Sequence, residues 1–300
     1  MPVAKYYHAG MKIFPILATM LAAGLAMAEP PVPAVQQPVQ ADVMTMTQDA
    51  RCKQVVVTCL INGQPMRMML DTGATHTVLH EESAASLKNV RWIDTSRMLF
   101  RGNSSQRPRL LVANLLAGPA ESAEHPFMVM NLGAVRSMMA EKIDGILGMD
   151  ILRAVPFTFD LRKNEFYWGV PQDTQLTPLR AVADGTGRVT VQGLCGGQTV
   201  RMLLDTGSSV TRVIASEWVP GEGSEIGAQM GNIDSAMGVS LMEGKPGDLE
   251  LGAGVVAKGI TPLLCEASDV PMLGMDALQG LVLVHVPSEE TPHGMFLIAQ

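Results

Sequence analysis

Two aspartates in the sequence are spaced and flanked in a way that could support acid–base chemistry. Asp71 and Asp205 each open an Asp-Thr-Gly tripeptide, and each follows a run of apolar residues. Such a run predicts a buried strand, so each carboxyl should emerge where a strand ends in a tight turn. Two neighbouring carboxyls share one proton and titrate as a pair. The ionised member can then take a proton from water while the other protonates a carbonyl, a hydrolysis that needs no metal and no cofactor.

The residues beside each aspartate predict a supporting loop. The glycines can adopt turn conformations and bring a backbone N–H close to the carboxylate. The threonine hydroxyls can bond to the backbone of the opposite copy. The catalytic pair is therefore Asp71 and Asp205, with loop support from Thr72, Gly73, Thr206, Gly207 and Ser208.

The two loops differ by one hydroxyl. Ser208 follows the second Asp-Thr-Gly, whereas Ala74 follows the first. A hydroxyl bonded to a carboxylate favours its ionised form. We therefore predict that Asp205 carries the negative charge and Asp71 carries the shared proton.

An internal repeat surrounds both aspartates. INGQPMRMMLDTGATHTVL (61–79) aligns with LCGGQTVRMLLDTGSSVTRVI (194–214), and GILGMDIL (145–152) aligns with PMLGMDAL (271–278). Two blocks in the same order at similar spacing indicate two copies of one unit. The structural motif of the second block comprises Ile146, Leu147, Gly148, Met272, Leu273 and Gly274.

The repeat predicts an N-terminal lobe at 43–172 and a C-terminal lobe at 173–300. Residues 1–28 are typical of an export signal, with Lys5 and Lys12 before an uncharged stretch that ends Ala26-Met27-Ala28. The Pro-rich segment 29–42 predicts an extended linker. We expect an exported protein, periplasmic or secreted, with no stable membrane insertion after signal cleavage. An uncleaved N-terminal anchor is the alternative.

Composition and pattern predict a mostly β protein. The chain is 47% hydrophobic with a net charge of −7, so no basic nucleic-acid-binding surface is expected. Short apolar or β-branched runs predict strands at 54–61, 65–70, 110–116, 188–191 and 247–251. Asn62-Gly63 and Gly196-Gly197 predict hairpin turns. Short helices are expected at 82–88 and 149–153.

These motifs resemble those of the pepsin-like and retropepsin-like aspartic peptidases. The resemblance rests on DTGAT and DTGSS, each followed by two apolar residues and a glycine, and the Leu-Gly-Met-Asp-x-Leu form is similar to bacterial retropepsin-like proteins. It covers roughly 43–300 and implies two retropepsin-like (acid protease) β-barrel lobes, fused in one chain, with a cleft between them. It also implies β-hairpin flaps, for which the candidates are 100–109 and 230–238.

Other polar residues have less specific interpretations. His76 and His80 could be metal ligands, but we expect surface histidines. Asp150 and Asp276 are expected to cap short helices. The methionines, 22 in number, could suggest copper, but core filling is the favoured interpretation. Arginines at 97, 101, 107 and 109 could attract acidic substrate residues, although a solvated loop is expected.

The four cysteines leave their pairing open. Cys52, Cys59, Cys195 and Cys265 allow three disulfide pairings in an exported protein. A Cys52–Cys59 bond is disfavoured because both lie on one extended segment. Zinc is the other use, but no CxxC pair is present.

The sequence therefore predicts an aspartic endopeptidase acting on a peptide or protein substrate, as a monomer with its two lobes paired within the chain. Two alternatives stay open. One is a non-catalytic peptide-binding or scaffold protein that retains the protease fold. The other is a dimer in which lobes pair between chains.

Overall fold

A computed structural model gives the fold. It describes residues 43–45, 47–48, 54–94, 109–163, 165–172, 174–183, 187–219, 232–234, 240–252, 254–265, 270–288 and 294–299. The export signal expected at 1–28 and the linker expected at 29–42 lie outside this part of the chain. None of the helices in the described ranges is long and apolar enough to cross a membrane.

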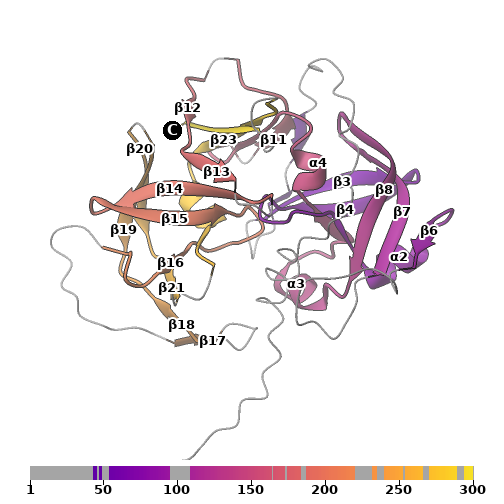
Figure 1. The fold of residues 1–300 in the computed structure, drawn as a ribbon, viewed down its shortest axis with the longest axis horizontal. Coiled ribbons are helices and arrows are strands. Elements are labelled where there is room, and N and C mark those ends of the chain that lie inside the picture. Colours follow the sequence, from indigo (N-terminus) through magenta and orange to yellow (C-terminus); the bar gives the residue numbers. More distant parts are fainter. Residues whose placement is uncertain are drawn as a thin grey trace, which may run out of the picture.

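The first half of the chain forms an eight-stranded sheet (Figure 1, indigo to magenta). In spatial order its strands are β2 (Thr47–Gln48), β3 (Val55–Ile61), β4 (Gln64–Leu70), β9 (Gly145–Leu147), β5 (Val78–His80), β8 (Ala120–Met130), β7 (Arg109–Ala117) and β6 (Arg91–Ile93). β3 also pairs with β7, through Leu60 and Leu116. This second pairing closes six of the strands into a barrel.

The second half repeats this arrangement in a ten-stranded sheet (Figure 1, orange). Its order is β17 (Asn232–Asp234), β18 (Ser240–Glu243), β21 (Leu263–Cys265), β16 (Arg212–Ile214), β22 (Met272–Leu273), β15 (Gln198–Leu204), β14 (Val189–Cys195), β19 (Gly247–Gly252) and β20 (Val255–Ile260), with β13 (Ala181–Ala183) beside β14. β20 pairs with β19, and β21 pairs with β16. Together they take the place of β8, so a strand that is continuous in the first half is interrupted here at Thr261 and Pro262.

A third sheet is built from both halves. It runs β1 (Val43–Thr45), β11 (Glu165–Trp168), β10 (Phe157–Asp160), β23 (Val282–Val286), β24 (Met295–Ala299) and β12 (Thr177–Pro178). The halves meet where β10 pairs with β23. In Figure 1 this sheet lies above the two lobes. It joins the lobes by backbone hydrogen bonds as well as by packing.

Aromatic residues are only 4% of the chain, yet several gather under this shared sheet. Phe157 stacks on His285 with ring centroids 4.8 Å apart, and Phe166 meets Trp168 edge-on at 5.0 Å. These side chains are all buried and belong to both halves. Burial of each large aromatic contributes a few kcal/mol, on the order of 2–3. The core therefore supports the junction between the lobes.

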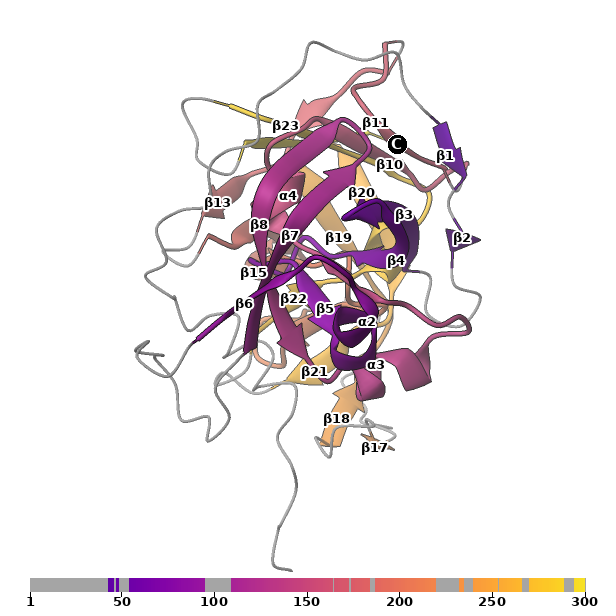
Figure 2. The same cartoon turned by 90° about the vertical axis from the view of Figure 1, so that its right-hand side faces the viewer.

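Four short helices lie in the described part of the chain. They are α2 (Glu81–Ser86), α3 (Gly133–Met138), α4 (Met149–Leu152) and α5 (Met275–Leu278). α4 and α5 follow the two Leu-Gly-Met-Asp blocks and are equivalent. α2 and α3 lie at the same end of the first lobe (Figure 2). The second lobe has no counterpart of α3 among its described residues.

The local elements agree with the sequence predictions. β3 and β4 meet at a two-residue turn in which Asn62 and Gly63 both have positive φ, 49° and 77°. Gly196 and Gly197 repeat this at 55° and 81°. Such turns match the twist of a hairpin. The predicted hairpins, the five predicted strands and both predicted helices are confirmed, with shifts of a few residues at the ends. α3 was not predicted.

Candidate active site

The two Asp-Thr-Gly loops are each held by the second block of their own repeat. β4 runs parallel to β9, and the Asp71 N–H donates to the Leu147 carbonyl at 3.1 Å. β15 runs parallel to β22, and the Asp205 N–H donates to the Leu273 carbonyl at 3.1 Å. The segments Ile146-Leu147-Gly148 and Met272-Leu273-Gly274 therefore lie directly behind the two aspartates.

The last residue of each segment must be small because the loop backbone passes over it. A Cβ on Gly148 would stand 2.7 Å from the backbone carbonyl carbon of His76. A Cβ on Gly274 would stand 2.6 Å from that of Val210. These distances leave no room for a side chain, so glycine allows the close approach of the two backbones.

The threonines of the two loops bond across the junction between the lobes. The Thr72 N–H donates to Thr206 Oγ1 at 3.0 Å, and the Thr206 N–H donates to Thr72 Oγ1 at 3.1 Å. Each hydroxyl in turn donates to the carbonyl before the opposite aspartate, at Leu204 (2.8 Å) and Leu70 (3.2 Å). Both threonines are fully buried. This reciprocal set fixes the two aspartate loops against each other.

The carboxyl groups of Asp71 and Asp205 lie close enough for each to shift the pKa of the other. Asp71 Oδ1 accepts the N–H groups of Gly73 (2.8 Å) and Ala74 (3.0 Å), and Asp205 Oδ1 accepts that of Gly207 (2.9 Å). Each carboxyl also lies against the glycine of the other loop. A Cβ on Gly207 would stand 2.5 Å from Asp71 Cγ, and one on Gly73 would stand 2.7 Å from Asp205 Cγ.

The surroundings of the two carboxyls are unequal. Burial raises the pKa of Asp71 well above its ordinary range, and the adjacent charge of Asp205 raises it further. Burial also raises the pKa of Asp205, but the hydrogen bond from Asp71, the Gly207 N–H and the positive charge of Arg212 oppose that rise. This pattern favours a shared proton held on Asp71 and a negative charge on Asp205.

The reason predicted for this inequality is wrong. The Ser208 hydroxyl donates to the Val210 carbonyl at 2.9 Å and not to the Asp205 carboxylate. A hydroxyl rotates to the acceptor in reach, and here the backbone carbonyl two residues on takes it. Of Ser208, only the backbone N–H acts on Asp205. The two carboxyls differ first through their interaction with each other and then through Arg212, which lowers the pKa of Asp205 and has no counterpart among the groups that act on Asp71.

Comparison with known proteins agrees with this geometry. Residues 57–151 match the family described as aspartyl protease. The chain contains an aspartyl protease domain. That domain carries Asp71 and the first Leu-Gly-Met-Asp block. No curated protein matches the chain.

The architecture also matches a solved structure. The crystal structure of basic 7S globulin from soybean superimposes with a TM-score of 0.54 and 12% sequence identity, over 87% of this chain and 95% of the globulin. At that identity the likeness concerns the fold alone. The chain thus has the mostly β, pepsin-like fold with two similar lobes that its sequence predicts.

Asp150 and Asp276, at the end of the second blocks, were expected to cap short helices, and this is wrong. Glycines 148 and 274 occupy the N-cap positions, and no side chain caps either helix. Instead Asp150 accepts the N–H (2.8 Å) and hydroxyl (2.7 Å) of Thr77. Asp276 accepts the same groups of Thr211, at 2.8 and 2.6 Å. These carboxylates pin the far end of each aspartate loop.

The hydrogen bonds between Asp150 and Thr77 form a latch on the first aspartate loop, and His125 also belongs to this latch. His125 Nε2 lies 3.3 Å from Asp150 Oδ2, and both side chains are buried. Ser122 Oγ lies 3.4 Å from His125 Nδ1, which suits a proton on Nε2 facing the carboxylate. Burial alone would raise the pKa of Asp150, but His125 and Thr77 outweigh it, so that pKa lies below its ordinary range.

Sequence reasoning missed Thr77, Thr211, His125 and Gln54. The two threonines had a usable signal, because both occupy the same position of the aligned repeat. Gln54 had none. Its Nε2 donates to the Gly207 carbonyl (2.9 Å) and to Ser209 Oγ (2.8 Å). A side chain of the first half thereby ties down the loop of the second.

The two histidines near the first loop are not surface residues as expected. His80 is buried, and its Nδ1 accepts the Leu132 N–H at 3.0 Å. His76 is half-buried, with Nδ1 2.9 Å from Thr75 Oγ1, and burial lowers its pKa. Within the described ranges no three His, Cys, Asp or Glu residues come together as a possible metal site.

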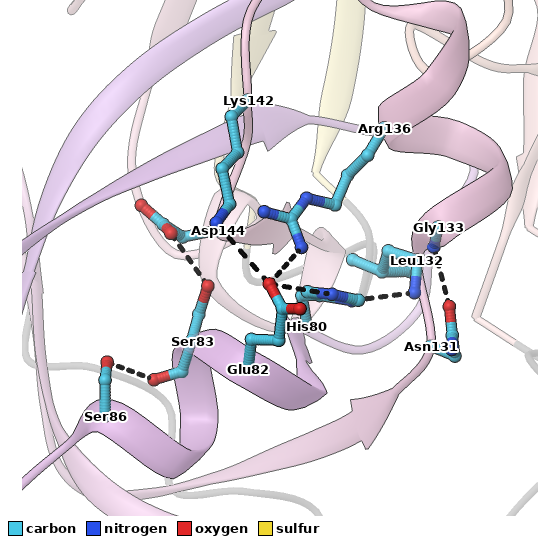
Figure 3. A network of polar contacts seen from close by, with 10 residues as sticks. All are labelled: His80, Glu82, Ser83, Ser86, Asn131, Leu132, Gly133, Arg136, Lys142 and Asp144. Atoms are coloured by element: carbon cyan, nitrogen blue, oxygen red, sulfur yellow. Dashed lines mark hydrogen bonds and ion pairs between the residues drawn. The ribbon is translucent and has the colours of Figure 1, made fainter.

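His80 belongs to a polar network around α2 and α3 (Figure 3). Glu82 on α2 bonds to Arg136 of α3 at 3.2 Å and to Lys142 at 3.4 Å. Asp144 accepts the Ser83 hydroxyl at 2.7 Å. These contacts join α2, α3 and the segment before β9. Exposed ion pairs of this kind contribute little stability each, about 0–1 kcal/mol, so their main effect is to orient α3.

The structure describes only some of the residues that the remaining sequence predictions concern. Cys59 and Cys195 are buried free thiols, Cys265 is also buried, and Cys52 lies outside the described residues. Burial raises the pKa of Cys59 to about 12, so this thiol is unreactive. Of the flap candidates, only residue 109 of the first and β17 of the second are described. The arginines at 97, 101 and 107 also lie outside the described chain.

Proposed function

We propose that this protein is an aspartic endopeptidase that hydrolyses peptide bonds with a water activated between Asp71 and Asp205. The observation that carries the proposal is the approach of the two carboxyls at the junction of the lobes, where each lies against the glycine of the opposite aspartate loop. Asp71 is nearly buried while Asp205 and both loop glycines keep partial exposure, so water can reach the pair from one side. The aspartyl protease domain at 57–151 supports the same activity.

The proposed reaction uses the two carboxyls as base and acid. Asp205 takes a proton from water as the water oxygen bonds to the carbonyl carbon, and Asp71 donates its proton to the carbonyl oxygen. The resulting tetrahedral diol collapses as a proton passes to the amide nitrogen and the C–N bond breaks. The products are a carboxylic acid and an amine. General acid and base catalysis each contribute about 10²–10⁴-fold in rate.

Activity should depend on the pair holding exactly one proton. Because burial raises the pKa of both carboxyls, each limb of the pH profile should lie above the ordinary range of an aspartate. The two pKa values of this profile belong to the pair as a whole. We assign the shared proton to Asp71 because the surroundings of Asp205 favour its ionised form more.

The proposal is tested by digestion of an unstructured protein over a pH series. We expect fragments in acid solution, and we expect a statine-type peptide, which imitates the tetrahedral diol, to block their formation. Proteolysis that persists under saturating inhibitor would identify a contaminating enzyme. Inhibitor binding without any proteolysis at any pH would favour a non-catalytic peptide-binding protein.

A methyl group at Gly207 should separate the carboxyls. Its Cβ would stand 2.6 Å from Asp71 Oδ2, so Gly207→Ala must displace that carboxyl. Misplacement of a catalytic group by about 1 Å can cost about 10²-fold. We therefore expect kcat/KM to fall by about 10²-fold with an unchanged circular dichroism spectrum. Ser208→Ala is the control, because that hydroxyl binds the Val210 carbonyl, and its kcat/KM should change less than about threefold.

The proposal extends to the setting of the enzyme. Residues 1–28 have the pattern of an export signal, and we propose a periplasmic or secreted protein that works as a monomer on peptide or protein substrates. Cell fractionation together with N-terminal sequencing of the mature chain tests export and cleavage at Ala28. Light scattering tests the monomer.

A further inference from the structure

Arg212 is a positively charged side chain with no described partner beside the catalytic pair. It is the first residue of β16, whose next residue, Val213, points into the core. Strand alternation places Arg212 on the opposite face. Its Nε is buried without a hydrogen-bond partner, and among the described residues its guanidinium forms no ion pair. A buried N–H that is left unsatisfied costs free energy, which a ligand acceptor would recover.

Arg212 pairs with Met272 of β22, which in turn pairs with Leu203, two residues before Asp205, so its charge is brought toward the reacting groups. Its field is one of the influences that lower the pKa of Asp205 against the effect of burial. Arg212 nevertheless makes no direct salt bridge to that carboxylate. Because no hydrogen bond joins its guanidinium to another residue in the described part of the chain, its N–H groups are able to donate to a ligand.

The first half has nothing similar at the matching position. Val78 aligns with Arg212 in the repeat, and both begin the strand after the aspartate loop. Val78 is buried in an apolar cluster with Leu132, Val135 and Met139. Those three residues come from 131–144, the connection that contains α3.

No comparable apolar cover is found among the residues of the second half that the structure describes. β5 pairs with the end of β8 at Met130, and β16 pairs in the same way with the end of β21 at Cys265. The connection onward to the second block is 131–144 in the first half but only 266–270 in the second. An element equivalent to α3, with its three apolar side chains, has no place in so short a connection. Arg212 thus occupies the position that the buried Val78 occupies in the first half.

We propose that Arg212 binds a carboxylate of the bound peptide next to the scissile bond, which makes the enzyme selective for acidic peptides. This inference rests on the proposed peptidase function and names its substrate class. A planar guanidinium can donate two parallel hydrogen bonds to one carboxylate. The carboxylate would accept from the unpaired donors and add a charge-assisted hydrogen bond, which a neutral side chain of the same shape cannot do.

The carboxylate could belong to an acidic side chain or to the end of the peptide chain. Two sets of peptides distinguish these sources. In the first set, Glu or Gln occupies each of the two positions on either side of the cleaved bond. In the second set, the C-terminus is free or amidated. A charge-assisted hydrogen bond should give at least a tenfold or so preference for the charged member in one set.

The variants assign that preference to Arg212. Arg212→Met should abolish it, and Arg212→Glu should reverse it in favour of Lys over Gln. Arg201→Met is the matched control, because Arg201 is an exposed arginine of the neighbouring strand β15, and this variant should keep the wild-type preference. The ratio of kcat/KM for paired peptides is compared at one pH, because removal of Arg212 also shifts the titration of Asp205.

Binding separates this inference from the proposed activity. The Asp71→Asn protein, which should not cleave, can be titrated with the same peptide pairs by calorimetry. If wild type cleaves nothing, the proposed function fails, but a Glu-over-Gln affinity ratio that depends on Arg212 still supports the inference. Equal affinity and equal cleavage for charged and neutral members in both sets would overturn it. So would a preference that survives in Arg212→Met.

Discussion

The Asp71→Asn variant is expected to lose peptidase activity by at least about 10³-fold while the protein becomes more stable at neutral pH. The amide cannot give up a proton to the carbonyl, so the variant lacks the general acid, which alone contributes about 10²–10⁴-fold. The shape of the site is preserved. The Asn oxygen can still accept the Gly73 and Ala74 N–H groups, and its NH₂ can donate to Asp205.

The gain in stability follows from the raised pKa of Asp71. The folded state binds this proton more tightly than the unfolded state does, so wild type loses stability as the pH rises from the ordinary aspartate pKa to the raised one. An asparagine does not titrate and avoids that loss. The stability difference between variant and wild type should therefore grow with pH through this window and level off above it.

Two measurements check the result. Initial rates on one cleaved peptide give kcat/KM, and thermal unfolding at several pH values gives the stability difference. Asp248→Asn is the control. Asp248 is an exposed aspartate at the start of β19, and its Oδ1 accepts the Gly259 N–H of β20. It should change neither quantity appreciably. A variant at Asp71 that retains a tenth of the wild-type rate would exclude this carboxyl as the general acid.

Features of the fold that depend on neighbouring residues could be predicted from the sequence. The hairpin between β3 and β4 follows from Asn62-Gly63 between two apolar runs, because few residues other than Asn and Gly tolerate positive φ. The repeat identified both aspartates and the blocks behind them, since a duplicated unit must place equivalent residues in equivalent positions.

Features that depend on distant contacts were missed. The sheet shared by β10 and β23 joins residues more than a hundred positions apart, and strand periodicity does not specify a partner. His80 lies on a short strand that α2 and α3 bury, and α3 itself is too short to produce a helical repeat. A polar residue there has no sequence signal for burial.

The sequence also could not predict which acceptor the Ser208 hydroxyl bonds to. Ser208 can reach a carboxylate or a carbonyl, and the turn at Val210 decides between them. Likewise Arg212 is one charged residue in an apolar strand, and only the pairing of β16 with β21 and β22 brings it beside Asp205. The direction of the asymmetry, with the charge on Asp205, thus stays a prediction, whereas the cause predicted for it, the Ser208 hydroxyl, is wrong.

The Asp150→Asn variant is expected to destabilise the protein by about 3–5 kcal/mol, because it replaces a buried carboxylate that accepts several hydrogen bonds, each worth about 1.5–3 kcal/mol when the acceptor is charged. Asp150 Oδ2 faces both the Thr77 N–H and His125 Nε2. Its other oxygen accepts the Thr77 hydroxyl and the Ile151 N–H. An amide must turn its NH₂ toward one of these pairs of donors, which leaves buried donors facing each other.

The second half supplies a matched control for this variant. Asp276 accepts the Thr211 N–H and hydroxyl in the same way, but the structure gives it no histidine partner and it is only half-buried. Asp276→Asn should therefore cost clearly less, about 1–2 kcal/mol for the weakened hydrogen bonds. Urea unfolding of both variants beside wild type gives the two values. Equal losses would show that His125 adds nothing to the latch.

The pH dependence of stability separates the effect of the Asp150 charge from the effect of side-chain packing. The pKa of Asp150 is lowered in the folded protein, so its contribution is complete above the ordinary aspartate range and is lost as the pH falls through the lowered value. The gap between wild type and Asp150→Asn should be constant near neutrality and narrow in strong acid. Because Asp150 and Thr77 hold the far end of the loop that begins at Asp71, loss of this latch should also lower kcat/KM where the protein is still folded. A gap that stays constant down to strong acid would mean that the carboxylate acts through its shape and not through its charge.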